Sequence, residues 1–472
     1  MAIANCAIQQ APLWNFFTAG EDIIFVISNN DAVANELKVK FIAEVHIGTT
    51  QITLSSTDDI IGTFKTTPNN AGVGMFNLGN IIDNYVKADN TASSFAKYKG
   101  ASASAAPFPI HIIDKFSKNK NTLKFLAIQF KVEYLDQDTN SITFGQLITG
   151  GAKNTTSYKF FNGYLKYTDE LQIGGVSVND FGYTKIQDFY LSGGTGRFLT
   201  NAPTTQYANS GDYGTLGFAI PDAGMALNAK SVKIYFYNDA GVAHSTNYEY
   251  TLLDGTGAYT TWSDDASKHI IYVGAYPGNV EQISGTWATL IAWGMTHYKV
   301  YVANSSGTPM SETITIHLNC PNTQGYESIR LCWLNQWGTW DYYTFTQKSV
   351  VNFTTQGSTY TQLGGTWNES SYDIASYKGG KKSFRRNATE KIKINTDFVI
   401  ENYNVMFEEL INSPEVYLLT GLQTDTYEAL NQYVTPVRIL SSNFTKKTKA
   451  NDQLIQYTFE IEKSKILRTQ SV

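Results

Sequence analysis

Apolar and polar residues alternate along much of this chain, and that alternation constrains the fold more than any other feature. In residues 37–49 (LKVKFIAEVHIGT), Phe41, Ala43 and Val45 share one face, while Lys40 and Glu44 occupy the other. Residues 124–136, 231–239, 297–304 and 454–462 repeat this pattern. A period of two residues is that of a β-strand with one buried face. We therefore predict an all-β, mainly antiparallel protein built from several sandwich-like or barrel-like domains.

Helical patterns are rare, and we expect only one or two short helices. The clearest pattern lies in residues 396–414 (TDFVIENYNVMFEELINSP), with Thr396 or Asp397 as N-cap and Ser413-Pro414 as the stop. Its apolar stripe comprises Ile400, Tyr403, Met406, Phe407, Leu410 and Ile411. This stripe predicts a helix near residues 397–412. A shorter amphipathic turn is predicted around Ile81, Ile82, Tyr85 and Val86.

Length and composition divide the chain into domains. A chain of 472 residues is too long for one ordinary domain. Polar segments begin near residues 201 (NAPTTQYANSGDYG) and 319 (NCPNTQGYES). We predict an N-terminal β domain over 1–200, a middle β-sandwich over 201–320 and a C-terminal β domain with the helix over 321–472. The small and polar residues 88–109 predict a flexible insertion in the first domain.

Charge and hydropathy exclude several classes of partner. Charged residues make up 16% of the chain, and the formal net charge is -5, so there is no general attraction to nucleic acid or to an anionic membrane. We expect no membrane partner, because no apolar run approaches ~18 residues. The N-terminus (MAIANCAIQQAPLW) has neither a basic segment nor a sustained apolar one, so we expect no secretory signal. Three cysteines fit reduced thiols of a protein made in a cytosol.

Motifs for metal binding and catalysis are weak. His317 and Cys320 form His-x-x-Cys with Cys332 further on, but zinc needs a fourth ligand that the sequence does not offer nearby. No Gly-x-Ser-x-Gly motif or catalytic Cys/His signature is present. We therefore predict no catalytic, cofactor-binding or metal-binding residues and a protein that is not an enzyme.

The stretch CWLNQWGTWDYYTF, Cys332–Phe345, concentrates aromatic rings around one acid. Alternation toward Gln336–Thr339, which contains Gly338, predicts a β-hairpin whose rings mostly fill a core. Asp341 then accepts hydrogen bonds from backbone N–H groups beside the turn. The alternative is a glycan-binding or depolymerising receptor-recognition protein. Its sugar platform would consist of Trp333, Trp337, Trp340 and Tyr342 beside Asp341, exposed on one concave face.

The strongest basic cluster lies in residues 377–386 (YKGGKKSFRR). It contains Lys378, Lys381, Lys382, Arg385 and Arg386, which we place on a loop around Gly379 and Gly380. Three interpretations stay open: a solvated loop, a contact with an acidic neighbouring subunit, or a contact with passing DNA.

Several motifs, taken in order, resemble those of virion structural proteins from tailed bacteriophages that infect Bacteroidetes. They are IFVISNN (24–30), FIAEVHI (41–47), GMFNLGNIIDNYV (74–86), FLTNAP (198–203), LCWLNQWGTWDYYTF (331–345), the helix-containing segment 395–419 and PVRIL (436–440). The resemblance covers most of the chain in patches and brings no catalytic residues with it.

This resemblance implies a non-enzymatic tail, collar or baseplate subunit located in the virion. The expected partners are other copies of the chain, in a ring guessed to be six- or twelve-fold, and other tail proteins. DNA contact is expected to be indirect or through the basic cluster. Low charge and many strands suit a subunit that buries strand edges in a symmetric assembly.

Overall fold

The computed structural model describes the chain apart from a set of short gaps. The gaps are 1–2, 55–59, 93–108, 166–167, 170, 176–177, 192–194, 221–228, 253–264, 283–284, 320–324, 367–368, 421–432, 449–454 and 469–472. The described residues form two compact units. Unit 1 holds those of 1–319 and the hairpin tip Leu334–Asp341, and unit 2 holds those of 320–333 and 342–472. Most of the predicted insertion, 93–108, lies outside the described residues. The three-domain division stays a prediction.

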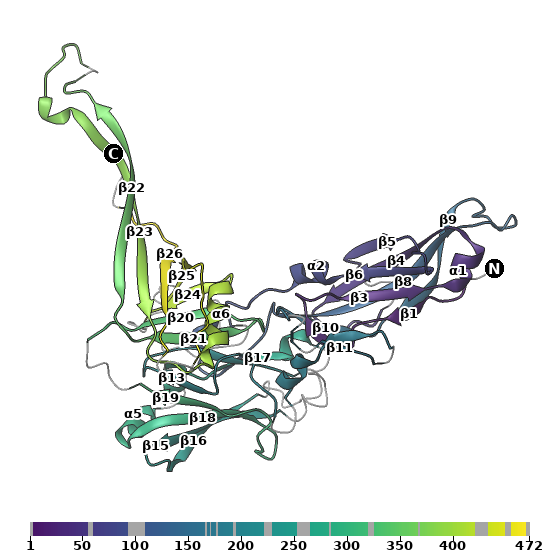
Figure 1. Ribbon diagram of the computed structural model, residues 1–472, viewed down its shortest axis with the longest axis horizontal. Helices are drawn as coiled ribbons and strands as arrows, with labels where there is room; N and C mark the ends of the chain where they lie inside the picture. Colours follow the sequence, from purple (N-terminus) through teal and green to yellow (C-terminus); the bar gives the residue numbers. More distant parts are fainter. Residues whose placement is uncertain are drawn as a thin grey trace. The chain divides into compact units, whose positions relative to one another are not determined.

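The N-terminal part of unit 1 is a two-layer sandwich. One layer is a sheet in the order β1-β3-β6, with β1 Ala7–Gln10, β3 Ile24–Ser28 and β6 Val73–Asn77. The other has the order β2-β10-β8-β4-β5, with β9 also paired to β8. Its strands are β2 Phe16–Thr18, β10 Tyr158–Phe161, β8 Leu123–Leu135, β4 Leu37–Gly48, β5 Gly62–Thr66 and β9 Leu147–Asn154. Phe25 and Phe76 of the small sheet pack on Phe130 of the large one, with ring centroids 5.7 and 5.8 Å away. Figure 1 shows the strands of both sheets in purple and blue.

The remainder of unit 1 contains three further sheets. The largest has the order β13-β19-β18-β15-β16, with β13 Thr205–Ala208, β19 Ile314–Leu318, β18 Met295–Ala303, β15 Ser231–Asn238 and β16 Ala243–Thr251. A second joins β14 Thr215–Ala219, β17 Ile270–Gly274 and β7 Phe116–Lys118, and a third pairs β11 Leu171–Ile173 with β12 Phe181–Tyr183. The tyrosine hydroxyl of Tyr298 donates to the carbonyl of Ala275 at 2.8 Å, which ties the first of these sheets to the segment after β17.

Unit 2 is organised around one sheet in the order β21-β20-β24-β25-β26-β23-β22. Its strands are β20 Ile329–Leu334, β21 Trp340–Phe345, β22 Val350–Gln362, β23 Gly380–Asn395, β24 Val416–Leu419, β25 Val434–Ile439 and β26 Thr458–Lys463. All pairings resolved between β20 and β22 along this order are antiparallel.

The predicted fold class is confirmed: the protein is all-β, and antiparallel except for the pairs β2–β10 and β13–β19. None of the sheets in the described ranges closes into a barrel. The described residues hold more short helices than the one or two predicted. The α-helices are α1 Asn30–Asn35, α2 Gly79–Ile82, α4 Pro277–Glu281, α5 Trp287–Ala292 and α6 Tyr403–Asn412. The 3-10 turns are η1 Asp83–Tyr85, η2 Ile110–Ile112, η3 Thr184–Phe189, η5 Ala266–Lys268 and η6 Ser376–Lys378.

Alternation identified the buried faces correctly. On β8, Leu126, Ile128, Phe130 and Val132 are all fully buried, as predicted. Phe125 and Ala127, on the opposite face of β8, are buried as well, because other parts of unit 1 cover that side. Phe125, for instance, lies edge-on to His269, with ring centroids 5.8 Å apart. Alternation therefore predicts one buried face of a strand, but a central strand such as β8 can bury the side chains of both faces.

The C-terminal helix begins later than predicted. The N-cap is Asn402, and neither Thr396 nor Asp397 caps the helix. Thr396 instead binds the terminal strand segment: its hydroxyl accepts from the Tyr457 N–H at 2.9 Å. Ile400, expected on the buried stripe, precedes the helix and is exposed. Of the rest of the predicted stripe, Tyr403, Met406, Phe407 and Leu410 are buried, whereas Ile411 is half-buried.

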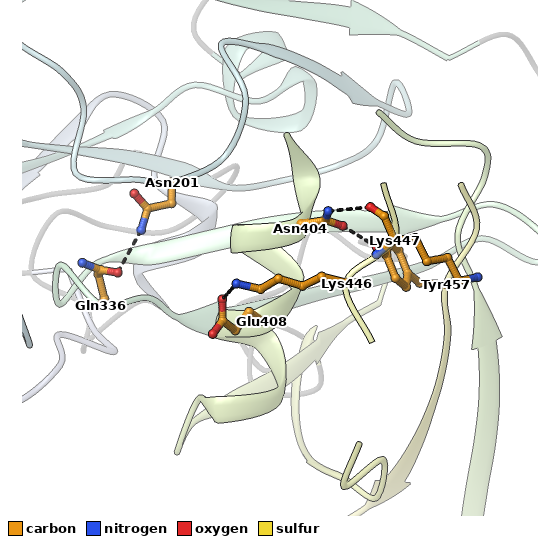
Figure 2. Close-up of polar contacts among 7 residues, drawn as sticks. All are labelled: Asn201, Gln336, Asn404, Glu408, Lys446, Lys447 and Tyr457. Carbon is orange, nitrogen blue, oxygen red and sulfur yellow. Dashed lines mark hydrogen bonds and ion pairs between the residues drawn. The ribbon is translucent and has the colours of Figure 1, made fainter. Parts of the chain in front are cut away.

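Polar contacts hold α6 in place within unit 2 (Figure 2). Asn404 accepts a hydrogen bond from the Tyr457 hydroxyl and donates to the carbonyl of Lys447 at 2.8 Å. On the outer side of the helix, Glu408 pairs with the ammonium of Lys446 at 2.5 Å. The helix is thus anchored at both its buried and its exposed face.

Candidate functional site: a basic β arm

Strands β22 and β23 and the residues that join them, 350–395, form the feature that we call the arm. Thr and aromatic residues favour extended structure in β22. The two strands pair from Val350↔Lys393 to Gln362↔Gly380, with one bulge at Ser358/Thr359. β26 pairs with β23 only between Lys391 and Asn395. Beyond that point the arm is a two-stranded ribbon that leaves the seven-stranded sheet of unit 2, as Figure 1 shows in green.

The basic cluster lies on this arm, and its placement on a loop was wrong. Lys378 ends the turn η6, while Lys381, Lys382, Arg385 and Arg386 all lie on β23. They are held in a strand because Gly380 starts the return of the hairpin and each has a partner position on β22. Within the described residues none of the five forms an ion pair. Lys382 donates a hydrogen bond to the side chain of Gln362 at 2.9 Å, and the Lys378 ammonium lies 5.9 Å from the Tyr377 ring centroid.

Large apolar side chains are exposed on the same arm. Ile374 and Tyr377, near its tip, are each 81% exposed. The other exposed large residues of the arm are Val350, Val351, Phe353, Leu363, Tyr372 and Phe384. Several large apolar side chains exposed on one element favour an interaction site in a soluble protein. The charge pattern in the sequence predicted the cations of this segment but not its exposed apolar side chains.

Both long edges of the ribbon are open. β22 is the last strand of its sheet, so its outer edge has no partner strand among the described residues. On β23, Ala388 forms a bridge with Leu467, and the Arg468 guanidinium donates to the side chain of Asn387 at 3.0 Å. From Gly380 to Arg386, no strand among the described residues pairs with the outer edge of β23. Open strand edges are sites for pairing with another chain.

The arm differs in charge from the rest of the chain. Residues 350–395 contain seven Lys or Arg and three Asp or Glu, which gives a net charge of +4. Since the whole chain carries -5, the remaining residues carry -9. One acid of the arm, Glu390, pairs with Lys463 at 2.7 Å near the base. The outer residues 357–386 hold five Lys or Arg and two acids, Glu369 and Asp373, so +3 of the +4 lies on the outer part of the ribbon.

The aromatic hairpin around Asp341 is not exposed. β20 and β21 flank a turn at residues 335–339, so the predicted hairpin is confirmed. Trp333, Trp337, Trp340, Asp341 and Tyr342 are all at most 4% exposed. In unit 1, Trp337 packs on Phe189 with ring centroids 3.9 Å apart, and the Trp340 indole N–H donates to the carbonyl of Asp89 at 2.9 Å. In unit 2, the Arg330 guanidinium lies 5.3 Å from the ring centroid of Tyr342. The exposed concave face that a sugar platform needs is not present at these residues.

Asp341 has a different role from the one predicted. Its carboxylate accepts from the hydroxyl of Thr200 at 2.5 Å and from the side-chain amide of Asn335 at 3.1 Å. The expected capping of the turn falls to Asn335, whose side-chain oxygen accepts from the N–H groups of Trp337 and Thr339. Asn201 adds a contact to the same turn by donating to Gln336 at 3.2 Å (Figure 2). These contacts fasten the hairpin tip to segment 198–203 in unit 1.

His317 belongs to a row of rings rather than to a metal-binding group. In strand register, Tyr207, His317, His297 and Tyr237 stand beside one another across four strands, with neighbouring ring centroids 5.3, 4.8 and 5.3 Å apart. Burial lowers the pKa of both histidines, and the neighbouring charges of His317 and Lys299 lower that of His297 further. Cys320 lies outside the described residues. In the part of the chain that the structure describes, no three His, Cys, Asp or Glu residues are grouped to hold a metal ion.

Unit 1 also contains an acidic cleft that no sequence motif predicted. It has a volume of about 760 Å³ and is lined in part by Glu21, Asp22, Asp83, Tyr164 and Tyr183. Glu21 is buried and accepts hydrogen bonds from the N–H and hydroxyl of Thr18 at 2.8 and 3.0 Å. Burial raises the pKa of Glu21 to about 7, and the charge of Asp22 adds to the effect. The adjacent acids in the sequence were the only signal, and adjacent acids are usually solvated.

Comparisons with known proteins add little. No protein-family model matches the chain, and no curated protein gives a significant match. A solved structure described as "Putative membrane anchored protein" from Corynebacterium diphtheriae aligns over 83% of this chain and 86% of its own length, with 9% identity and a TM-score of 0.14. A similarity at that TM-score carries no inference about fold or function. Among the described residues, no helix is long and apolar enough to cross a membrane.

Proposed function

We propose that the protein is a non-enzymatic structural subunit of a tailed-phage virion, most simply a tail, collar or baseplate component. It is synthesised in the host cytoplasm and joins a symmetric ring of identical chains, together with other tail proteins. The ordered series of motifs described in the sequence analysis supports the virion assignment. The burial of the Asp341 hairpin gives no support to a glycan-binding role at that site.

The arm is the observation that carries this proposal. Among the described residues, it combines exposed large apolar side chains, open strand edges and cations without an ion-pair partner on one ribbon outside the core of unit 2. For an isolated chain these features are a liability, because open edges and exposed apolar surface promote uncontrolled association. In a symmetric assembly a neighbouring surface covers them, and their exposure in a single chain is then expected.

The proposal is tested by the state of the purified full-length chain and by its location in phage particles. Light scattering and negative-stain images should show a closed ring, with six or twelve copies as the expected number. Antibodies against the chain should label one end of the particle, at the tail. A soluble monomer at high concentration whose antibodies do not label particles would refute the proposal.

A further inference from the structure

We propose that the arm of one copy docks on the acidic body of the next copy, in a head-to-tail contact. This inference rests on the proposed function, which requires self-assembly. It specifies the two surfaces through which neighbouring copies bind each other. The arm carries +4 and the rest of the chain -9, so arm and body attract one another across copies.

The sign of the charge distinguishes two kinds of symmetric contact. If two arms paired with each other, a net charge of +4 would face +4, and like charges across an interface oppose association. If the arm meets the body of another copy, opposite charges face each other. Such a contact uses two different surfaces of the same chain. Contacts of this kind form rings when the rotation closes.

The arm has the reach and the chemistry for this contact. From Phe353 to Gln362, β22 extends roughly 33 Å beyond the part of the ribbon that is joined to β26. Along that length it offers backbone donors and acceptors on its outer edge. Phe353, Leu363 and Ile374 add apolar surface, which a protein surface can cover.

Nucleic acid fits the same features less well. The cations of β23 could bind phosphates, but phosphates offer nothing to Ile374 or Leu363. The charge of -9 on the remaining residues would also repel DNA. We therefore take a second copy of this chain as the partner, and DNA as the outcome that would contradict it.

The first experiment uses a full chain with a shortened arm. Residues 357–386 are replaced by Asn-Gly, which joins the paired residues Gln356 and Asn387 through a tight hairpin turn and keeps the Ala388–Leu467 bridge. An unchanged far-ultraviolet spectrum and melting temperature of unit 1 show that the body is folded. Alone, this variant should lose ring formation.

Co-expression of the shortened chain with the wild type then tests the head-to-tail geometry. A tagged shortened chain should capture untagged wild-type chain, because its body still accepts a wild-type arm, and it should end growing assemblies. Arm-to-arm pairing gives no capture. The proposal is overturned if the shortened chain captures no wild-type chain, or if the shortened chain forms rings alone. In both cases a wild-type chain that forms rings stays consistent with the proposed function. A monomeric wild type instead counts against the proposed function itself.

The second experiment changes charge without changing the backbone. Lys381, Lys382, Arg385 and Arg386 are all replaced by Gln, and the control replaces the exposed Lys38, Lys40, Lys153 and Lys465 by Gln, with the same change in net charge. The arm variant should assemble about tenfold more weakly and with a flatter salt dependence, whereas the control should stay within about twofold. Assembly of the arm variant that equals wild type, with or without a loss of DNA binding, overturns the proposal.

Discussion

Gly338, in the turn of the aromatic hairpin, offers the sharpest test of how the tip is held in unit 1. Its φ is +71°, a conformation that disfavours any residue with a Cβ atom. A Cβ atom built there would lie 1.6 Å from the backbone carbonyl oxygen of Asn162. Gly241, in the turn between β15 and β16, has nearly the same φ of +73° but nothing within 4 Å of its Cβ position. An alanine at Gly241 would therefore experience backbone strain alone, whereas an alanine at Gly338 would experience the same strain and a steric clash.

The magnitudes follow from that difference. Left-handed φ costs an alanine about 1–2 kcal/mol at either position. At Gly338 the Asn162 carbonyl must also move by more than 1 Å, since Cβ contacts below 3.0 Å are not tolerated. Overpacking against a backbone atom adds about 1–3 kcal/mol. We expect Gly338→Ala to lower the free energy of unfolding of unit 1 by about 2–5 kcal/mol, and Gly241→Ala by about 1–2 kcal/mol.

Urea unfolding of both variants, followed by far-ultraviolet circular dichroism and tryptophan fluorescence, measures the difference. Any gain from the reduced freedom of the unfolded alanine chain is the same for both variants and cancels. Equal losses for Gly338→Ala and Gly241→Ala would refute the close approach of the hairpin tip to Asn162.

Two further predictions concern α6 and Glu21. Leu410→Ala should lower the free energy of unfolding by about 2–5 kcal/mol because its side chain is fully buried. Glu408→Ala removes one partly exposed ion pair and should lower it by about 0.5 kcal/mol. Equal melting temperatures of the two variants would show that the buried face of α6 is assigned wrongly. Because the folded-state pKa of Glu21, about 7, exceeds its ordinary 4.5, the native state binds more protons between those values, and unit 1 should lose up to about 3 kcal/mol as pH rises from 4.5 to above 7. Urea midpoints at pH 5 and 8.5 test this, and an equally steep change in Glu21→Gln would contradict it.

The sequence by itself determined the strands with alternating apolar and polar residues, which residues of each strand share a face, and the aromatic hairpin. These depend on the local period of two and on one glycine turn, so the chain needs no distant partner to specify them. The same holds for the core of α6, where Met406, Phe407 and Leu410 follow helical spacing. The helix start was misplaced because Thr396, a good cap locally, binds Tyr457 instead, sixty-one positions away.

Only the tertiary structure decided what covers each surface. The sequence allows Asp341 and its neighbouring rings to form either a buried core or an exposed sugar-binding platform. Thr200 and Phe189, both far away in sequence, pack against the hairpin tip and make it a core. The basic residues of β23 read equally well as a loop, and only the register with β22 makes them part of a ribbon whose sheet contacts end at its base. Local periodicity determines which residues share a face. Whether that face is buried depends on the pairing of segments remote in sequence, and a local pattern carries no information about that pairing.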